Sequence, residues 1–237
     1  MTKPWIAATL GLTTLLAHTA SAQTHPDLRQ ILQRVSDTYR AASQYELFAA
    51  ATTHDDDTND TARMHFAFKG PNRYRMEGAL PGGMALDAAE FSQAVLVHDG
   101  SNLWFYLPKT NQYGSFSASQ LTPDAGGDLG DLAPGFLDQM MLGRYRDAAA
   151  FPVTSFLREE AVEFGGSKVA CYVVTVSRSR NSTVYTWWID KQTNYILRED
   201  NPGSSTVFTA IKINEPLADT LFRFDPPAGA RKVDIGK

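Results

Sequence analysis

Apolar and polar residues alternate in short runs along most of the chain, and turn residues separate the runs. Alternation with a period of two is typical of strands that have one buried and one exposed face. It predicts about eleven strands, over residues 45–53, 62–68, 72–78, 93–99, 102–107, 111–117, 155–164, 168–177, 183–190, 195–200 and 205–215. So many short strands at close spacing predict a mainly β protein built on a single large antiparallel sheet or barrel.

Two segments have helical periodicity instead. Apolar residues recur at spacings of three and four over residues 26–45, which predicts a helix with Thr24 as its cap and Pro26 in its first turn. Residues 134–150 are also helical in character, and they follow a stretch at 122–134 that is rich in Gly, Asp and Pro. We expect this stretch to be a loop and the second helix to cover the sheet as a lid.

The segment 97–112, VHDGSNLWFYLPKTNQ, predicts a hairpin. Asp99-Gly100 forms its turn, because glycine accepts the positive φ that tight hairpin turns need. The returning strand, 103–107, is apolar on both faces and ends at Pro108. Both faces of this strand should therefore be covered.

The N-terminus has the three parts of a secretory signal peptide, which we assign to residues 1–22. These parts are Lys3, an apolar run at 6–17 and an A-x-A cleavage site that ends at Ala22. Cleavage would release a single domain, 23–237, as a soluble exported protein of the periplasm. A membrane anchor is the alternative, but the run is shorter than the roughly 20 apolar residues that span a bilayer. No cysteine lies near the cleavage site, which excludes lipid attachment there.

Charge and cysteine content narrow the possible partners. The full chain has a formal net charge of −4, and the loss of Lys3 with the signal peptide would make it −5. This balance does not favour nucleic acid or anionic membrane surfaces. The single cysteine, Cys171, can form no intramolecular disulfide. We interpret it as an inert core thiol rather than a nucleophile, since no His or Asn lies close in sequence to activate it.

No motif predicts catalysis, a metal site or a cofactor. The run from Asp55 to Asp60 places oxygen ligands at alternate positions, as calcium loops do. Its sixth residue is Asp60 where such a loop needs Gly, and its twelfth is Phe66 where the loop needs Glu. We therefore expect a solvated hairpin tip that binds no calcium. The histidines are not paired at metal-ligand spacing, and the chain has no G-x-S-x-G, H-E-x-x-H or phosphate loop.

Aromatic residues are concentrated in two of the predicted strands, around Trp104 and Trp188. An ordinary β core would explain them, and so would a cavity between the sheet and a lid. Methionines in the segment 134–150 suit an adaptable cover over variable apolar ligands. Alternation assigns the following candidate linings to such a cavity: Phe66, Phe68, Tyr74, Met76, Leu96, Phe105 and Trp188 from the sheet, with Phe136, Met140 and Met141 from the lid.

The predicted hairpin resembles a recurrent hairpin of the LolA/LolB-like proteins of the bacterial envelope. The matching residues are Asp99, Gly100, Leu103, Trp104, Phe105, Tyr106, Pro108 and Gln112. Three further segments, 68–78, 186–200 and 208–234, are similar to other parts of that family and occur in the same order. The resemblance covers most of the chain after the signal peptide.

The resemblance implies an incompletely closed antiparallel barrel of about eleven strands, with helices on its concave side. It implies a carrier that binds the acyl chains of lipoproteins or lipids. Its partners would then include an inner- or outer-membrane lipoprotein-handling protein, and the carrier itself would be a monomer. RseB/MucB-like relatives offer the alternative of a stress sensor or regulatory module that binds a protein partner, and a purely structural envelope protein is a third possibility.

One departure from the carriers concerns their lid. They keep a basic residue that helps to hold the lid closed, and Gly70 stands at that place here, with Lys69, Arg73 and Arg75 nearby. The latch of the carriers therefore does not transfer to this sequence.

Overall fold

The computed structural model of the chain describes residues 27–54, 59–78, 93–117, 119 and 134–234. The predicted signal peptide, most of the acidic run 55–60 and the Gly- and Asp-rich stretch before residue 134 lie outside the described residues.

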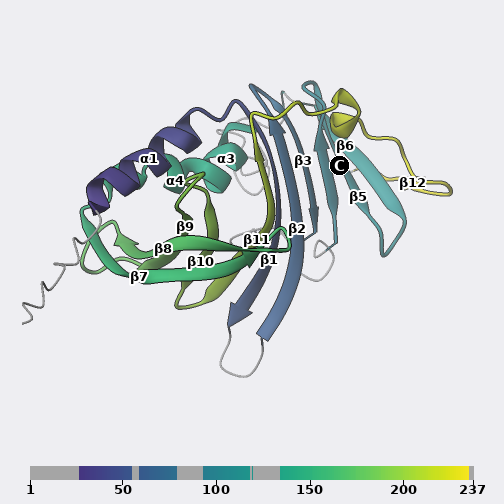
Figure 1. Cartoon of the computed structure of the whole chain (residues 1–237). Helices are drawn as coiled ribbons and strands as arrows, with labels where there is room; N and C mark the ends of the chain where they lie inside the picture. The colour runs from purple at the N-terminus through teal and green to yellow at the C-terminus, as the bar shows by residue number, and fades with distance from the viewer. Residues whose placement is uncertain (1–26, 55–58, 79–92, 118, 120–133, 235–237) are drawn as a thin grey trace, which may run out of the picture.

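The described part is mainly β, and its strands form a single sheet that does not close into a barrel (Figure 1). The sheet order is β12-β6-β5-β4-β3-β2-β1-β11-β10-β9-β8-β7. The strands are β1 (Gln44–His54), β2 (Asn59–Lys69), β3 (Arg73–Gly78), β4 (Val95–His98), β5 (Asn102–Leu107), β6 (Gln112–Ser117), β7 (Val153–Phe164), β8 (Ser167–Ser177), β9 (Tyr185–Asp190), β10 (Ile196–Asn201), β11 (Ser204–Ile213) and β12 (Arg231–Lys232).

These strands confirm the predicted fold class. Every expected strand is present, and β1 to β11 pair with their neighbours in antiparallel fashion. The twelfth strand, β12, is two residues long and pairs with β6 in parallel. It was not expected because a pair of exposed basic residues carries no alternating pattern.

The N-terminal helix α1 spans Leu28–Arg40, and Asp27 is its cap rather than Thr24. The side chain of Asp27 accepts a hydrogen bond from the backbone N–H of Gln30 at 3.2 Å, which satisfies one of the free amides of the first turn. The helix ends five residues earlier than expected. Asn214, at the end of β11, donates to the Ala41 carbonyl at 2.8 Å and thereby holds the chain where it leaves the helix.

The expected helix over 134–150 is broken into four short pieces, which corrects the prediction of one continuous lid helix. They are α3 (Pro134–Asp138), the π turn η4 (Gln139–Gly143), α4 (Arg144–Arg146) and the 3₁₀ turn η5 (Ala148–Ala150). Apolar spacing alone cannot distinguish this arrangement, because a π turn shifts the following residues by a fraction of a turn only. We call residues 134–150 the helical cover.

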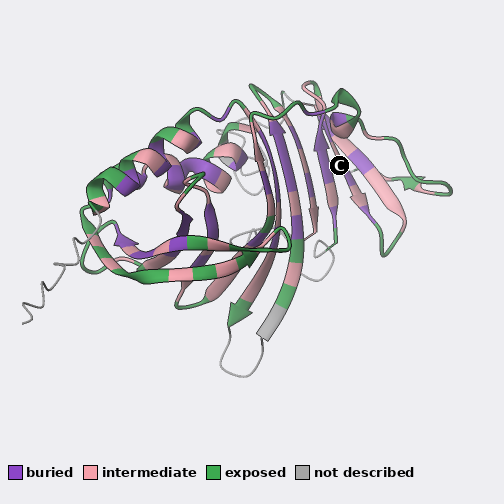
Figure 2. Cartoon of the chain, viewed as in Figure 1, coloured by how far each residue is buried: buried purple, intermediate pink, exposed green. Residues whose placement is uncertain are grey.

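The sheet has a cover on each face. The helical cover and α1 lie together on the concave side of the bent sheet (Figure 1). Both contribute buried residues to the main hydrophobic cluster, which Figure 2 marks along the ribbon. On the outer face, residues 214–224 include the short turn η6 (Asp219–Phe222). Leu217, just before this turn, and Phe222, at its end, pack against Ala67 of β2. We call residues 214–224 the outer strap.

The hairpin at Asp99-Gly100 shows why the strand 103–107 needs both covers. Gly100 adopts a φ of 104°, and Asp99 accepts hydrogen bonds from the backbone of the turn and from the Trp104 indole at 2.9 Å. Phe105 points into the core, whereas Trp104 stacks on Phe224 of the outer strap with ring centroids 5.6 Å apart. The prediction that both faces of this strand are covered is confirmed.

Candidate functional site

Six of the predicted lining residues share the concave face of the sheet. Phe66, Met76, Leu96 and Phe105 stand directly opposite one another across β2, β3, β4 and β5. Phe68 and Tyr74 form a neighbouring pair in the same face, one step along the strands. All six are buried, so they form a continuous apolar surface on the concave face of the sheet.

The helical cover supplies the opposite wall. Leu137 and Leu142 are fully buried against the sheet, and Met140 and Met141 are half-buried and pack against the same cluster. The Phe136 side chain lies outside the described part of the structure. The buried residues of the cover and of the sheet face belong to one hydrophobic cluster.

Trp188 does not lie with the other candidates, and its neighbour Trp187 takes the place expected for it. The Trp187 ring contacts Tyr145 and Phe151 of the concave side edge-on, at 5.6 and 5.5 Å between centroids. Trp188 points to the other face of the sheet, where the guanidinium of Arg198 lies 4.5 Å from its ring centroid. The sequence reads Trp-Trp at this point, so alternation could not decide which of the two faces inward.

The first polar anchor of the cover joins α3 and α4 to the sheet and to α1. Arg146 makes two hydrogen bonds to the Asp138 carboxylate, at 2.6 and 2.9 Å, and Tyr45 of β1 donates to the same carboxylate at 3.0 Å. Arg146 also donates to the Tyr39 carbonyl of α1 at 3.2 Å. Two-point pairing of this kind fixes both orientation and distance.

The second anchor is Glu199 of β10, which is 6% exposed and sits beneath α4. Its carboxylate accepts from Arg144 of the cover and from the Trp187 indole, the latter at 2.8 Å. Burial raises the pKa of Glu199 above its ordinary value, although Arg144 and Trp187 act in the opposite direction. Glu199 therefore binds the cover through a carboxyl group that is shielded from water.

These anchors take the place of the latch that the sequence left unassigned. The backbone of Gly70 donates to the Ser43 carbonyl at 3.1 Å and offers no side chain. Its neighbours Lys69 and Arg73 turn to the outer face, where both pair with Asp219 of the outer strap at 2.8 and 3.0 Å. The roles of Arg144, Arg146 and Glu199 as anchors could not be predicted from the sequence, because charged residues in a helix or strand are expected to be exposed.

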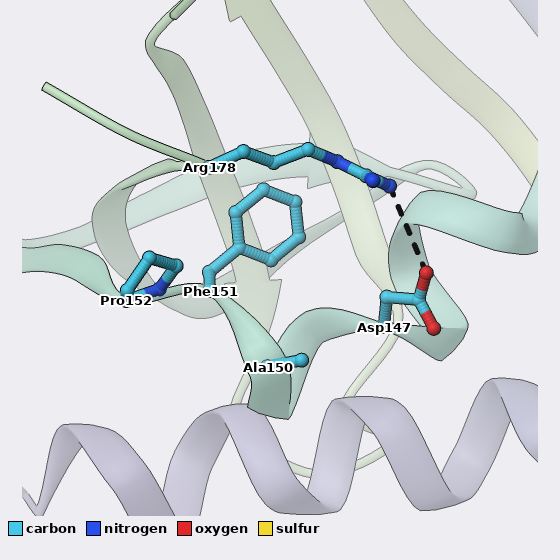
Figure 3. Close-up of a pocket in the computed structure, with 5 residues that line it drawn as sticks. All are labelled: Asp147, Ala150, Phe151, Pro152 and Arg178. Atoms are coloured by element: carbon cyan, nitrogen blue, oxygen red, sulfur yellow. Dashed lines mark ion pairs between the residues drawn. The ribbon is translucent and has the colours of Figure 1, made fainter. Parts of the chain in front are cut away.

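Two openings near the surface are lined by residues that the structure describes. One, of about 310 Å³, is at the end of the helical cover and is lined by Asp147, Ala150, Phe151, Pro152 and Arg178 (Figure 3). We call it the end pocket. The other, of about 580 Å³, lies on the outer face beside the outer strap, and Glu46, His65, Arg75, Glu77 and Lys212 supply its charged walls. We call it the outer groove.

Among the described residues, no group of three or more potential metal ligands comes together. Within the same residues, no helix is long and apolar enough to cross a membrane.

One curated protein is related to the chain in sequence. No family model matches the chain. The uncharacterized protein MJ0687 of Methanocaldococcus jannaschii is 22% identical over 209 residues, which is 87% of this chain and 54% of that protein. The chain thus spans about half the length of the curated relative it matches.

The chain covers a larger share of the solved structures that it resembles than of MJ0687. LprF from Mycobacterium bovis superposes with a TM-score of 0.53 at 10% identity, over 82% of this chain and 96% of that protein. The LolA superfamily protein NE2245 from Nitrosomonas europaea matches with a TM-score of 0.33 at 15% identity, over 83% and 97%. MucB in the MucA/MucB complex of Pseudomonas aeruginosa matches with a TM-score of 0.44 at 14% identity, over 84% and 61%. The chain shares the fold of LprF, and its open antiparallel sheet with helices on the concave side is the architecture that the sequence predicts.

Proposed function

We propose that the protein binds the acyl chains of lipids or lipoproteins without covalent attachment, between the concave face of the sheet and the helical cover. The observation that carries this proposal is the pairing of a continuous apolar face with a cover made of short pieces. If the cover served only to complete a hydrophobic core, one regular helix would be more stable, because a regular helix pairs more of its own backbone N–H and C=O groups than several short pieces do.

The energetics favour exchange of the cover for a ligand. Burial of an acyl chain contributes about 0.8 kcal/mol per methylene, so ten methylenes contribute about 8 kcal/mol. The chain must displace apolar contacts of the cover, such as those of Met140 and Met141, and these half-buried side chains repack readily. The anchors at Asp138 and Glu199 then keep the cover attached while its apolar side moves.

The location and partners belong to the same proposal. The signal peptide expected at residues 1–22 supports export to the periplasm, where a monomeric carrier would receive its cargo from one lipoprotein-handling protein and deliver it to another. No residue is assigned a catalytic role, so the proposed activity is binding and release.

Native protein, purified from the periplasm without detergent, should release acyl-containing molecules into an organic extract, detected by mass spectrometry. A dansyl-labelled fatty acid should also bind the delipidated protein and be displaced by a triacylated lipopeptide. The double substitution Met140→Lys and Met141→Lys should weaken the probe at least fivefold, because two charges would enter the apolar wall.

Trp188→Phe is the matched control, since Trp188 lies on the other face of the sheet and its substitution should leave probe binding unchanged. Circular dichroism establishes that both variants are folded. Probe binding no stronger than that of an unrelated soluble β protein, together with a lipid-free extract, would remove the proposal and favour a module that binds a protein partner.

A further inference from the structure

Phe151 connects the end pocket to the apolar interior. Phe151 is 8% exposed and forms part of the pocket wall. Its ring also meets the Trp187 ring edge-on at 5.5 Å, and Trp187 belongs to the concave interior. The pocket therefore adjoins the interior at Phe151, the residue of its wall that contacts the buried Trp187.

The charged groups of the end pocket are held loosely. Arg178, which follows β8, extends across the Phe151 ring toward Asp147 (Figure 3), with its guanidinium carbon 5.8 Å from the ring centroid. The closest approach of the Arg178 and Asp147 charges is 3.7 Å, which is longer than a hydrogen bond. The two side chains are 66% and 45% exposed, so water weakens their attraction.

Apolar side chains continue from the pocket onto the surface. Val153 follows Pro152 and is 40% exposed, and Val184 is 46% exposed. Val153 pairs with Ser177, and Val184 immediately precedes Tyr185, which pairs with Val176. Both valines therefore lie beside the strand end from which Arg178 emerges, and the pocket combines one loosely held cation with an apolar rim.

The outer groove is larger but has the opposite character. Its lysine and its histidine both lie against Glu46, with Lys212 at 2.7 Å and His65 at 3.0 Å, and Arg75 pairs with Glu77. An anion entering the groove would have to displace two carboxylates from their partners. Of the two openings, the end pocket is the one that suits an anionic ligand.

We propose that the end pocket is the mouth of the acyl-chain site, and that Arg178 binds the anionic head of an amphiphile whose chain lies over Phe151 toward the interior. This inference rests on the proposed function and adds the class of ligand, a single-chain amphiphile with an anionic head. The volume of about 310 Å³ is at the lower end of small-molecule sites, which suits a head and the first part of a chain. Asp147 competes with the ligand for Arg178 and so favours release.

The test compares a long-chain fatty acid with its methyl ester by calorimetry. Arg178→Gln should weaken the acid about five- to tenfold and leave the ester within twofold, because only the acid has a charge for Arg178 to bind. Asp147→Asn should strengthen the acid about two- to threefold and not the ester. Raising the salt concentration should weaken the acid alone.

Arg180→Gln is the matched control, since Arg180 is an exposed arginine two residues away from Arg178. It should change neither ligand. If Arg178→Gln weakens acid and ester equally or leaves both unchanged, the mouth is elsewhere, while the carrier proposal still stands on binding of the ester. If neither ligand binds the unmodified protein, the proposed function and this inference fall together.

Discussion

The two covers of the sheet are built on different physical principles. The helical cover is tied to the concave face by polar bonds at the partly buried Asp138 and the buried Glu199. The outer strap is tied to the outer face by exposed charges at Asp219 and by aromatic contacts of Phe222 and Phe224. Asp219 is 73% exposed at its side chain, whereas Glu199 is nearly inaccessible to water.

This difference indicates that the helical cover, rather than the outer strap, is suited to move. A buried charge-assisted bond holds one geometry and is lost only when its whole surroundings open. A pair of such bonds at the base of short helical pieces can act as a pivot about which the apolar surface of the cover shifts. Exposed ion pairs contribute little, so the outer strap depends on packing and has no comparable pivot.

The largest expected effect is at Glu199. Glu199→Ala leaves Arg144 and the Trp187 indole without their shared acceptor, and should lower the free energy of unfolding by about 3 kcal/mol. Urea unfolding followed by circular dichroism measures this loss. A loss below about 1 kcal/mol would show that water replaces the carboxylate and that Glu199 is not an anchor.

A smaller effect is expected at Phe224 of the outer strap. Phe224→Ala removes the stack on Trp104 and the contact with Tyr113, and should cost about 1 kcal/mol. The emission of Trp104 should shift to longer wavelength as its ring becomes exposed to water. Phe224→Leu keeps much of the buried area and serves as the control, with a smaller loss of stability.

Acid should affect the two faces in opposite directions. Hydrogen bonding to His65 and pairing with Arg75 lower the pKa of Glu77 on the outer face to about 2, although burial opposes the shift. The stability that Glu77 contributes is therefore present above its unfolded pKa of about 4.5 and is lost as the pH falls toward 2. The raised pKa of Glu199 has the reverse consequence, since its contribution is complete below about 4.5 and is lost as the pH rises through the folded value.

Unfolding midpoints of Glu77→Gln and Glu199→Gln across this pH range test the contrast. The original protein should lose stability relative to Glu77→Gln between pH 4.5 and 2. It should gain stability relative to Glu199→Gln as the pH falls through the raised pKa of Glu199 toward 4.5. Slopes of the same sign for both pairs would contradict the opposite pKa shifts of Glu77 and Glu199.

The smallest effect is expected at Asp219. Asp219→Ala removes both ion pairs of the outer strap, with Lys69 and Arg73, yet should change the free energy of unfolding by only about 0.5 kcal/mol. A loss comparable to that of Glu199→Ala would mean that charges hold the outer strap as firmly as the helical cover.

The local pattern of apolar and polar residues was sufficient to predict most of the sheet. Alternation located every long strand, and Asp99-Gly100 located the hairpin, because these signals depend on neighbours a few residues apart. The candidate lining from Phe66 to Phe105 was also placed on one face correctly, since the pleat of a strand determines which side chains share a face.

Long-range contacts decided the rest. The end of α1 depends on Asn214, and the inward choice of Trp187 over Trp188 accompanies a bulge between Ile196 and Arg198 of the neighbouring strand pair. Both depend on residues that the local pattern does not include.

The polar anchors of the candidate site also depend on long-range contacts. A glutamate in a strand and an arginine in a helix have the sequence signature of exposed residues, and only the folding of β10 under α4 buries Glu199 against Arg144. Strand positions and apolar faces could be predicted from the amino-acid pattern, because those properties follow from short-range periodicity. The tertiary structure alone decided where the covers are anchored and where the end pocket opens, because a buried charge is stable only where a distant partner satisfies it.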